Sequence, residues 1–199
     1  MSTAVHRNAP VQEHAWRTPY KGTVGMLALI VGESALFTIF VVAYVFYIGK
    51  SVTGPTPAQV LEVPILGTIC LLSSSFSIWR SEHAIATGKM KQFGVWLAIT
   101  IALGVIFLIG TALEWKKLIY NDGLTISTNL FGTTFYSLVG LHATHVILGL
   151  AMLSFVLLFT LLGRFEQKQS ERFQVIALYW HFVDLVWVVV FSVVYLFGR

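Results

Sequence analysis

The chain has 199 residues, of which 56% are hydrophobic and only 11% are charged, and its formal net charge is +4 at pH 7. A soluble globular domain carries about 25% charged residues, so this composition excludes an ordinary soluble protein and predicts a membrane protein. The 13 lysines and arginines are scattered through the polar segments rather than gathered in one patch, which argues against nucleic-acid binding.

Residues 1–23 are predicted to form a polar tail. This segment lacks the short apolar core and the small-residue cleavage site of a signal peptide. We therefore expect the first apolar run to direct membrane insertion. Residues 24–199 are expected to form a single bundle.

Five apolar runs follow the tail, at residues 24–48, 63–87, 93–119, 130–162 and 173–197. Each run is long enough to cross about 30 Å of hydrocarbon, which takes about 20 residues of helix. Turn formers or charges separate the runs, among them Pro55 and Pro57 after the first and Gly88 after the second. The predicted fold is all-α, a polytopic bundle of five transmembrane helices.

The distribution of positive charge predicts the orientation of the bundle. Nine lysines and arginines fall in the tail and in the second and fourth loops, whereas four fall on the opposite side. Cytoplasmic loops carry the excess of positive charge in membrane proteins. We therefore expect a cytoplasmic N-terminus and a C-terminus outside.

Several ionisable residues lie well inside the predicted spans: Glu33, His142, His145, His181 and Asp184. A charge at the centre of a span costs about 2.5 to 3.5 kcal/mol, so each of these side chains should face protein or water and have a partner. At 1.5 Å per residue, Glu33 lies roughly 14 Å from the cytoplasmic end of its span. The two histidine-containing pairs fall at a comparable depth and could meet it in one layer.

Two interpretations of these residues are open. His142 and His145 are three residues apart, as are His181 and Asp184, so each pair projects from one face of its helix. Two histidines and the two carboxylates, Glu33 and Asp184, could bind a divalent ion in the bundle. The preferred alternative needs no ion: each histidine and acid satisfies another across helices, with Asp184 orienting His181.

Glu33 has several possible roles, since a glutamate at this depth can be neutral and packed, bound to polar groups of lipid or protein, or active in proton movement. Glu114 lies at an outer helix end next to Lys116 and Lys117, where we expect an interfacial ion pair. Arg80, Glu82 and His83 lie at an inner helix end and are expected to snorkel or pair there.

Two segments carry specific motifs. Residues 179–187 read YWHFVDLVW, and residues 131–149 contain FGTTFY, then GLHATHV, then Gly149. These segments resemble the last two helices of subunit III of heme-copper respiratory oxidases. Weaker similarities in the first three runs include Glu33, residues 71–75 and the pair Glu114 and Trp115.

The resemblance implies the shorter, five-helix form of that family, in the cytoplasmic (inner) membrane of a bacterium. Family members hold no heme or copper themselves; these cofactors are expected in partner subunits. The implied partners are the catalytic subunit I, subunit II, a small subunit IV and phospholipids. The implied contacts with lipid or neighbouring subunits involve Glu33, Arg80, His83, Trp180 and Trp187.

The function that the resemblance implies is accessory. Family members support proton uptake and protect the catalytic subunit from inactivation during turnover, without a catalytic or metal site of their own. The family's carbodiimide-reactive glutamate corresponds to Glu33. Tyr179 and Glu33 favour the cytochrome c branch; quinol oxidases and a nitric oxide reductase-associated protein are alternatives within the same family.

Two functions of other classes compete with this one. An ion-coupled transporter could use Glu33 and the histidines within the membrane, although the sequence has no inverted repeat. An intramembrane metalloenzyme is the second, although the chain has six histidines and some lie outside the predicted spans.

Overall fold

The structure is a computed structural model that describes residues 20–51 and 53–198. Most of the predicted tail, residues 1–19, lies outside the described residues. The first helix already begins at Lys21, three residues before the start that hydropathy predicted. Glycine at positions 22 and 25 does not prevent this early start, because a bundle helix is stabilised mainly by its surroundings rather than by propensity.

Each predicted apolar run corresponds to one long helix. The bounds are α1 Lys21–Tyr47, α3 Ile65–Ala86, α4 Met90–Tyr120, α5 Leu130–Leu161 and α6 Ser170–Phe191. A π-helical segment, η2 Ser192–Phe197, continues α6, and a 3₁₀ turn, η1 Gln167–Gln169, precedes it. The fold is therefore an all-α bundle, as the composition predicted.

Four helices of the described chain have the length and hydropathy needed to cross a membrane: α1, α4, α5 and the continuous stretch Gln167–Phe197. The helix α3 is not among them, although its 22 residues would extend about 33 Å at 1.5 Å per residue. Its sequence is interrupted by Ser73, Ser74 and Ser75 in the middle and by Arg80 and Glu82 near its end. Many of its polar side chains face other helices.

A short helix, α2 Pro57–Val60, lies in the segment that we expected to contain only a turn. Proline at the first helical position is already set to a helical φ, and its missing N–H has no partner there in any case. The Gln59 side chain accepts a hydrogen bond from the Thr56 backbone N–H, which completes a capping box. The sequence predicted only a turn at these prolines, because a helix of a single turn leaves no periodic pattern to recognise.

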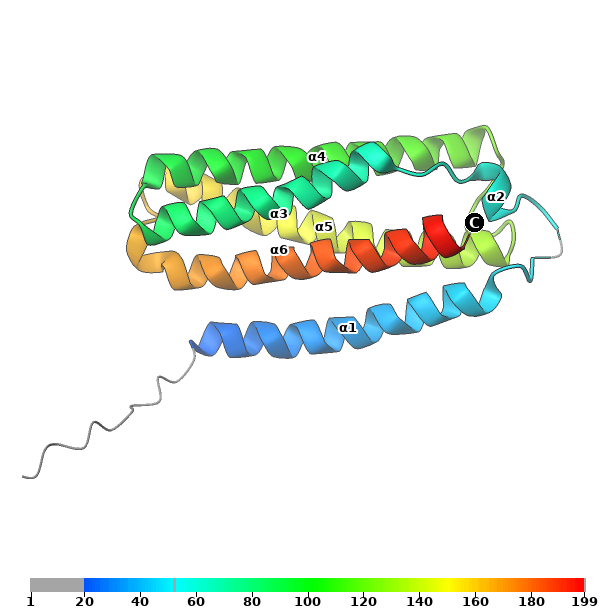
Figure 1. Ribbon diagram of the computed structural model, residues 1–199, viewed down its shortest axis with the longest axis horizontal. Coiled ribbons are helices and arrows are strands. Elements are labelled where there is room, and N and C mark those ends of the chain that lie inside the picture. The colour runs from blue at the N-terminus through cyan, green and yellow to red at the C-terminus, as the bar shows by residue number, and fades with distance from the viewer. Residues whose placement is uncertain (1–19, 52, 199) are drawn as a thin grey trace, which may run out of the picture.

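Consecutive long helices are antiparallel, and the connections between them lie at the two ends of the bundle (Figure 1). The start of α1, the α3–α4 turn and the α5–α6 turn lie at one end, called here the inner end. The C-terminus, the α1–α3 connection and the α4–α5 loop lie at the other, called the outer end. Helix α1 packs on α5 and α6, while α3 packs on α4 and α6.

The outer end is tied together through Asn129, which caps α5. Its side-chain oxygen accepts a hydrogen bond from the Gly132 N–H at 2.8 Å, the usual role of an asparagine before a helix. Its amide group donates to the carbonyls of Thr53 and Pro55 at 3.0 and 3.2 Å. The α1–α3 connection is thereby fixed against the start of α5.

Trp180 joins four helices at the centre of the bundle. It is fully buried, and its indole N–H donates to Ser74 of α3 at 2.9 Å. A Cβ atom placed at Gly104 of α4 or at Gly149 of α5 would lie 2.9 Å or 2.8 Å from its ring. These two glycines therefore make the slot that admits the indole.

Candidate functional site

Glu33 and His145 form a pair between α1 and α5. The Glu33 Oε2 and His145 Nε2 atoms are 3.1 Å apart, and the two side chains are 25% and 9% exposed. The other ring nitrogen of His145, Nδ1, lies 2.8 Å from the carbonyl oxygen of Leu141. Phe37 packs against the imidazole with ring centroids 4.9 Å apart.

The contacts of His145 fix which of its nitrogens carries a proton. A carbonyl oxygen can only accept, so Nδ1 must donate its hydrogen to Leu141. Nε2 then either accepts from a protonated Glu33 or, in a doubly protonated ring, donates to an ionised Glu33. In either case one proton lies between the two heavy atoms, and the hydrogen bond persists whichever of the two atoms carries it.

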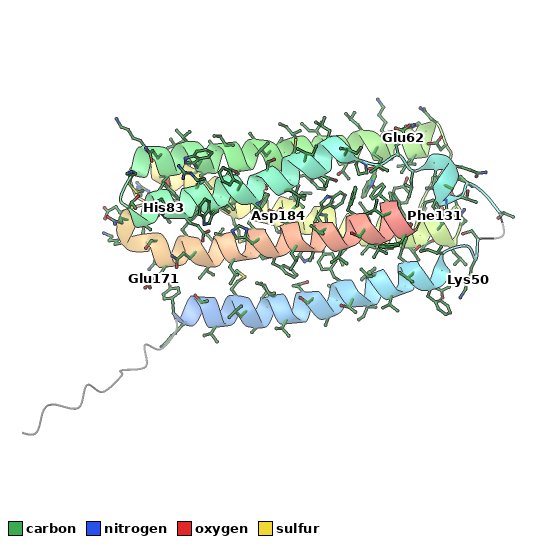
Figure 2. All side chains as sticks on the ribbon, in the orientation of Figure 1. Lys50, Glu62, His83, Phe131, Glu171 and Asp184 are labelled. Atoms are coloured by element: carbon green, nitrogen blue, oxygen red, sulfur yellow. The ribbon has the colours of Figure 1, made fainter. Side chains whose placement is uncertain are left out.

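Asp184 and His181 of α6 form a second group with α3. The Ser75 hydroxyl donates to Asp184 Oδ2 and also lies 3.5 Å from His181 Nδ1. His181 Nε2 lies 3.6 Å from Glu82 Oε2. The side chain of Asp184 is 3% exposed and lies about midway along the bundle (Figure 2).

His142 belongs to neither group. It is fully buried, and neither ring nitrogen has a hydrogen-bond partner among the described residues. Its ring stacks on Trp187 at 5.2 Å between centroids and meets the edge of Phe107 at 5.9 Å. His142 therefore packs as an aromatic ring.

Four of the five ionisable residues are thus distributed over two interfaces, and His142 belongs to neither. Glu33 meets His145 between α1 and α5, whereas Asp184 and His181 meet Ser75 between α6 and α3. Within residues 20–51 and 53–198, no three His, Cys, Asp or Glu side chains are grouped so as to hold a metal ion. Nothing in this arrangement resembles a ligand shell.

Glu114 lies near the outer end and accepts hydrogen bonds from the Tyr195 hydroxyl at 3.0 and 3.1 Å. The ion pair at this end joins Lys117 to Glu62. Glu114 also lines a pocket of about 450 Å³ between the start of α3 and the outer half of α4. The structure thus gives Glu114 a buried tyrosine as its hydrogen-bond partner.

The remaining predicted contact residues divide into exposed and buried ones. Arg80 is exposed, with its guanidinium 5.5 Å from the centroid of the Trp96 ring, and His83 is exposed at the inner end. Trp180 and Trp187 are buried, and the Trp187 indole donates to Thr68 at 3.2 Å. The two tryptophans therefore hold helices of this chain together.

Sequence reasoning did not single out Ser75, Tyr179 or Tyr195 as partners of the ionisable residues. Tyr179 donates to the carbonyl of His145 at 3.3 Å, which supports the Glu33 pair. A helical spacing argument could have found Ser75, because it shares a face with Glu82 seven residues away. Partners on other helices leave no such signal in the sequence.

Comparisons with known proteins agree with this architecture. The family model for cytochrome c oxidase subunit III matches residues 12–199. Cytochrome c oxidase subunit 3 of Alkalihalophilus pseudofirmus is 32% identical over 203 residues, covering 100% of this chain and 98% of that protein. The subunit 3 of Tachyglossus aculeatus aculeatus is 36% identical, covering 96% of this chain and 76% of that protein. The subunit 3 of a Synechocystis species is 38% identical over 176 residues, covering 86% of this chain and 74% of that protein.

The family match covers every helix of the described bundle, including both groups of buried polar side chains. The chain belongs to the cytochrome c oxidase subunit III family.

Proposed function

We propose that this chain is the non-redox accessory subunit III of a proton-pumping terminal oxidase that takes electrons from cytochrome c. The match of the subunit III family model to residues 12–199 carries this proposal. Heme and copper reside in the partner subunits I and II. This chain packs on the catalytic subunit, and a small subunit IV is a further candidate partner.

The Glu33–His145 pair suits a supporting role because a proton is all that it can exchange. A carboxyl and an imidazole that share one proton can take up or release it locally. We assign to this pair the support of proton uptake and of stability during turnover. Tyr179 and Phe37 position the imidazole for it.

We assign the N-terminus to the cytoplasm of a bacterium and the C-terminus to the outside. The nine lysines and arginines in the tail and inner loops support this orientation. We also assign α3 as the fifth membrane span, since it runs alongside α4 and α6 (Figure 1). Ser74, Ser75 and Ser77 then face helices, which offer hydrogen-bond partners that lipid lacks.

Phospholipid is the ligand that we expect on the surface of the bundle. An apolar pocket of about 280 Å³ lies between α1 and α6 and is lined by Phe37 and Phe182 among others. Ser34 and Thr38 are among its polar lining residues. Its position beside Phe37 would place an acyl chain next to the Glu33 pair.

Purification of the respiratory complex from native membranes tests the proposal. A tag on this chain should recover the catalytic heme-copper subunit in a fixed ratio, and reduced-minus-oxidised spectra of the product should contain heme bands. Electron transfer from reduced cytochrome c to dioxygen should accompany them. Recovery of this chain without any heme protein would contradict the proposal, and oxidation of quinol instead of cytochrome c would contradict the electron donor.

A further inference from the structure

Four polar side chains follow one another along the interface of α3 and α6. Glu82 Oε2 lies 3.6 Å from His181 Nε2, and His181 Nδ1 lies 3.5 Å from the Ser75 hydroxyl. The same hydroxyl is hydrogen-bonded to Asp184 Oδ2. Each member of the series can both give and take a proton, which is the requirement for a relay.

The series connects the inner end of the bundle with its middle. Glu82 and Ser75 are seven residues apart on α3, which corresponds to about 10 Å along the helix axis. The Glu82 side chain is 24% exposed, and its neighbour His83 lies near the inner end (Figure 2). Asp184 is 3% exposed and lies about midway along the bundle.

We propose that Asp184 is a proton-storage site that is filled from the inner end through Glu82, His181 and Ser75. In the starting arrangement Glu82 is a carboxylic acid, His181 carries its proton on Nδ1, and Asp184 is ionised. Glu82 gives its proton to His181 Nε2, His181 Nδ1 gives its own to the Ser75 oxygen, and the Ser75 proton passes to Asp184 Oδ2. Glu82 ends as a carboxylate and Asp184 as an acid, so one proton has moved and no charge is created.

The buried end of the series has a physical reason to accept a proton. Asp184 Oδ1 is buried and has no hydrogen-bond partner among the described residues. A buried charged oxygen without a donor is costly, whereas the carbonyl oxygen of a neutral acid tolerates that environment better. Proton transfer to Asp184 therefore removes an unfavourable charge from the interior.

The series that ends at Asp184 is separate from the Glu33–His145 pair. Glu33 and His145 contact each other between α1 and α5, away from the α3–α6 interface. The α4 helix offers Thr100, which bonds Ser77 rather than Ser75 at 2.8 Å. Ser77 is thus a buried serine of the same helix that lies outside the relay.

Infrared spectroscopy of the complex in deuterated buffer tests the proposal. The carboxylic acid band that disappears in Asp184→Asn identifies Asp184, and its shift after transfer to D₂O reports how fast the site exchanges its proton. Ser75→Ala should slow that exchange about tenfold or more, because the link between His181 and Asp184 is lost. Ser75→Thr keeps the hydroxyl and should restore the rate.

Two further variants make the test decisive. Ser77→Ala removes a comparable hydroxyl outside the relay and should leave the exchange rate of Asp184 at the wild-type value. Glu82→Gln changes a partly exposed residue without threatening the fold, and it should slow exchange as well. The proposal is wrong if Asp184→Asn removes no acid band, or if Ser75→Ala and Glu82→Gln both exchange at the wild-type rate.

The storage role rests on the proposed function, because an oxidase would draw on the stored proton. The exchange measurement is independent of it, since the band belongs to this chain whether or not heme subunits co-purify. Loss of co-purification with normal exchange would remove the oxidase assignment alone. Intact co-purification with unaltered exchange in Ser75→Ala and Glu82→Gln would remove the relay alone.

Discussion

Glu33 is the residue at which the hydrogen bond and the proton can be separated experimentally. A glutamine at this position can donate an amide hydrogen to His145 Nε2, so the contact of 3.1 Å can be kept without a titratable proton. A leucine removes both the contact and the proton. The two substitutions therefore distinguish a chemical role from a packing role.

We predict that Glu33→Gln changes the stability of the chain by less than about 1 kcal/mol but speeds inactivation of the oxidase during turnover several-fold. Glu33→Leu should in addition destabilise the chain by about 1 to 3 kcal/mol, because Nε2 of a nearly buried imidazole loses its partner. Thermal unfolding in detergent and the decay of oxygen consumption measure the two effects. If turnover, pumping ratio and decay all stay at wild-type values in Glu33→Gln, Glu33 only packs.

The sequence predicted which residues needed partners but not which partners they find. The cost of a charge inside the membrane was enough to single out Glu33, His145 and Asp184. Their pairing depends on which helices become neighbours, and a single sequence carries no record of that. His142 is the clearest example, since its spacing to His145 suggested a shared role and the fold places its ring against Trp187 instead.

At the scale of helices, the close approach of α4 and α5 to Trp180 depends on two residues without side chains. A Cβ atom on Gly104 would lie 2.8 Å from Leu150 and 2.9 Å from the Trp180 ring. The leucine can turn away, but the indole is fixed by its hydrogen bond to Ser74. The strain from a Cβ atom added at Gly104 therefore cannot be relieved by moving the indole.

We predict that Gly104→Ala lowers the stability of the chain by about 1 to 3 kcal/mol, the usual cost of overpacking a core. Gly110→Ala on the same helix is a matched control, because nothing lies within 4 Å of the added carbon. That control should be neutral or stabilising by up to about 1 kcal/mol, since alanine is the better helix former. Circular dichroism during heating compares the two, and equal losses in both would refute the role of the slot.

Helix types and approximate bounds were predictable because long apolar runs leave few alternatives. The single-turn helix α2 was not, because four residues give no periodicity to read. The hydropathy of α3 is a third case. Its serines lower the hydropathy of the helix, and the hydrogen bonds of Ser74, Ser75 and Ser77 to Trp180, Asp184 and Thr100 appear only when the other helices are in place.

For the whole molecule, the two ends of the bundle can be told apart by chemical labelling. The chain has one cysteine, Cys70, within α3, so a Cys70→Ala background offers no thiol of its own. Ser127 lies in the α4–α5 loop and Lys168 in the α5–α6 turn, and both are exposed. Cysteine at each position gives a pair of reporters on opposite ends.

We predict that a membrane-impermeant maleimide labels Ser127→Cys in intact cells and leaves Lys168→Cys unlabelled. The reason is the excess of lysine and arginine at the inner end, because cytoplasmic loops of membrane proteins carry the excess of positive charge. Opening the membrane with detergent should make both thiols reactive, which controls for access. Labelling of Lys168→Cys alone in intact cells would reverse the assigned orientation.

Charge counting gives a predicted orientation, whereas the bundle itself shows only which loops share an end. Charge counting does not predict which other subunits assemble with this chain. Beyond the expectation that Glu33 finds a partner, the packing of α1 on the rest could not be foreseen, because apolar residues surround this helix on all sides. In the structure, only Phe37 and Tyr44 of α1 are buried. Glu33 and several partly buried side chains also contact the bundle, and the exposed remainder of this helix is available to lipid or to a neighbouring subunit.

Because α1 contacts the bundle along one side, the two sides of this helix should vary differently among related proteins. Glu33, Phe37 and Tyr44 of α1 meet the bundle and recur at intervals of four and seven, so they follow one line along the helix. Partly buried side chains beside this line also pack against the core: Met26, Ile30, Phe40 and Val41. Changes along that line would disturb a buried partner, whereas changes elsewhere on α1 alter only what the helix presents outwards. Across related organisms, this helix can therefore adjust its outer face to a different membrane or neighbour while the line itself stays fixed.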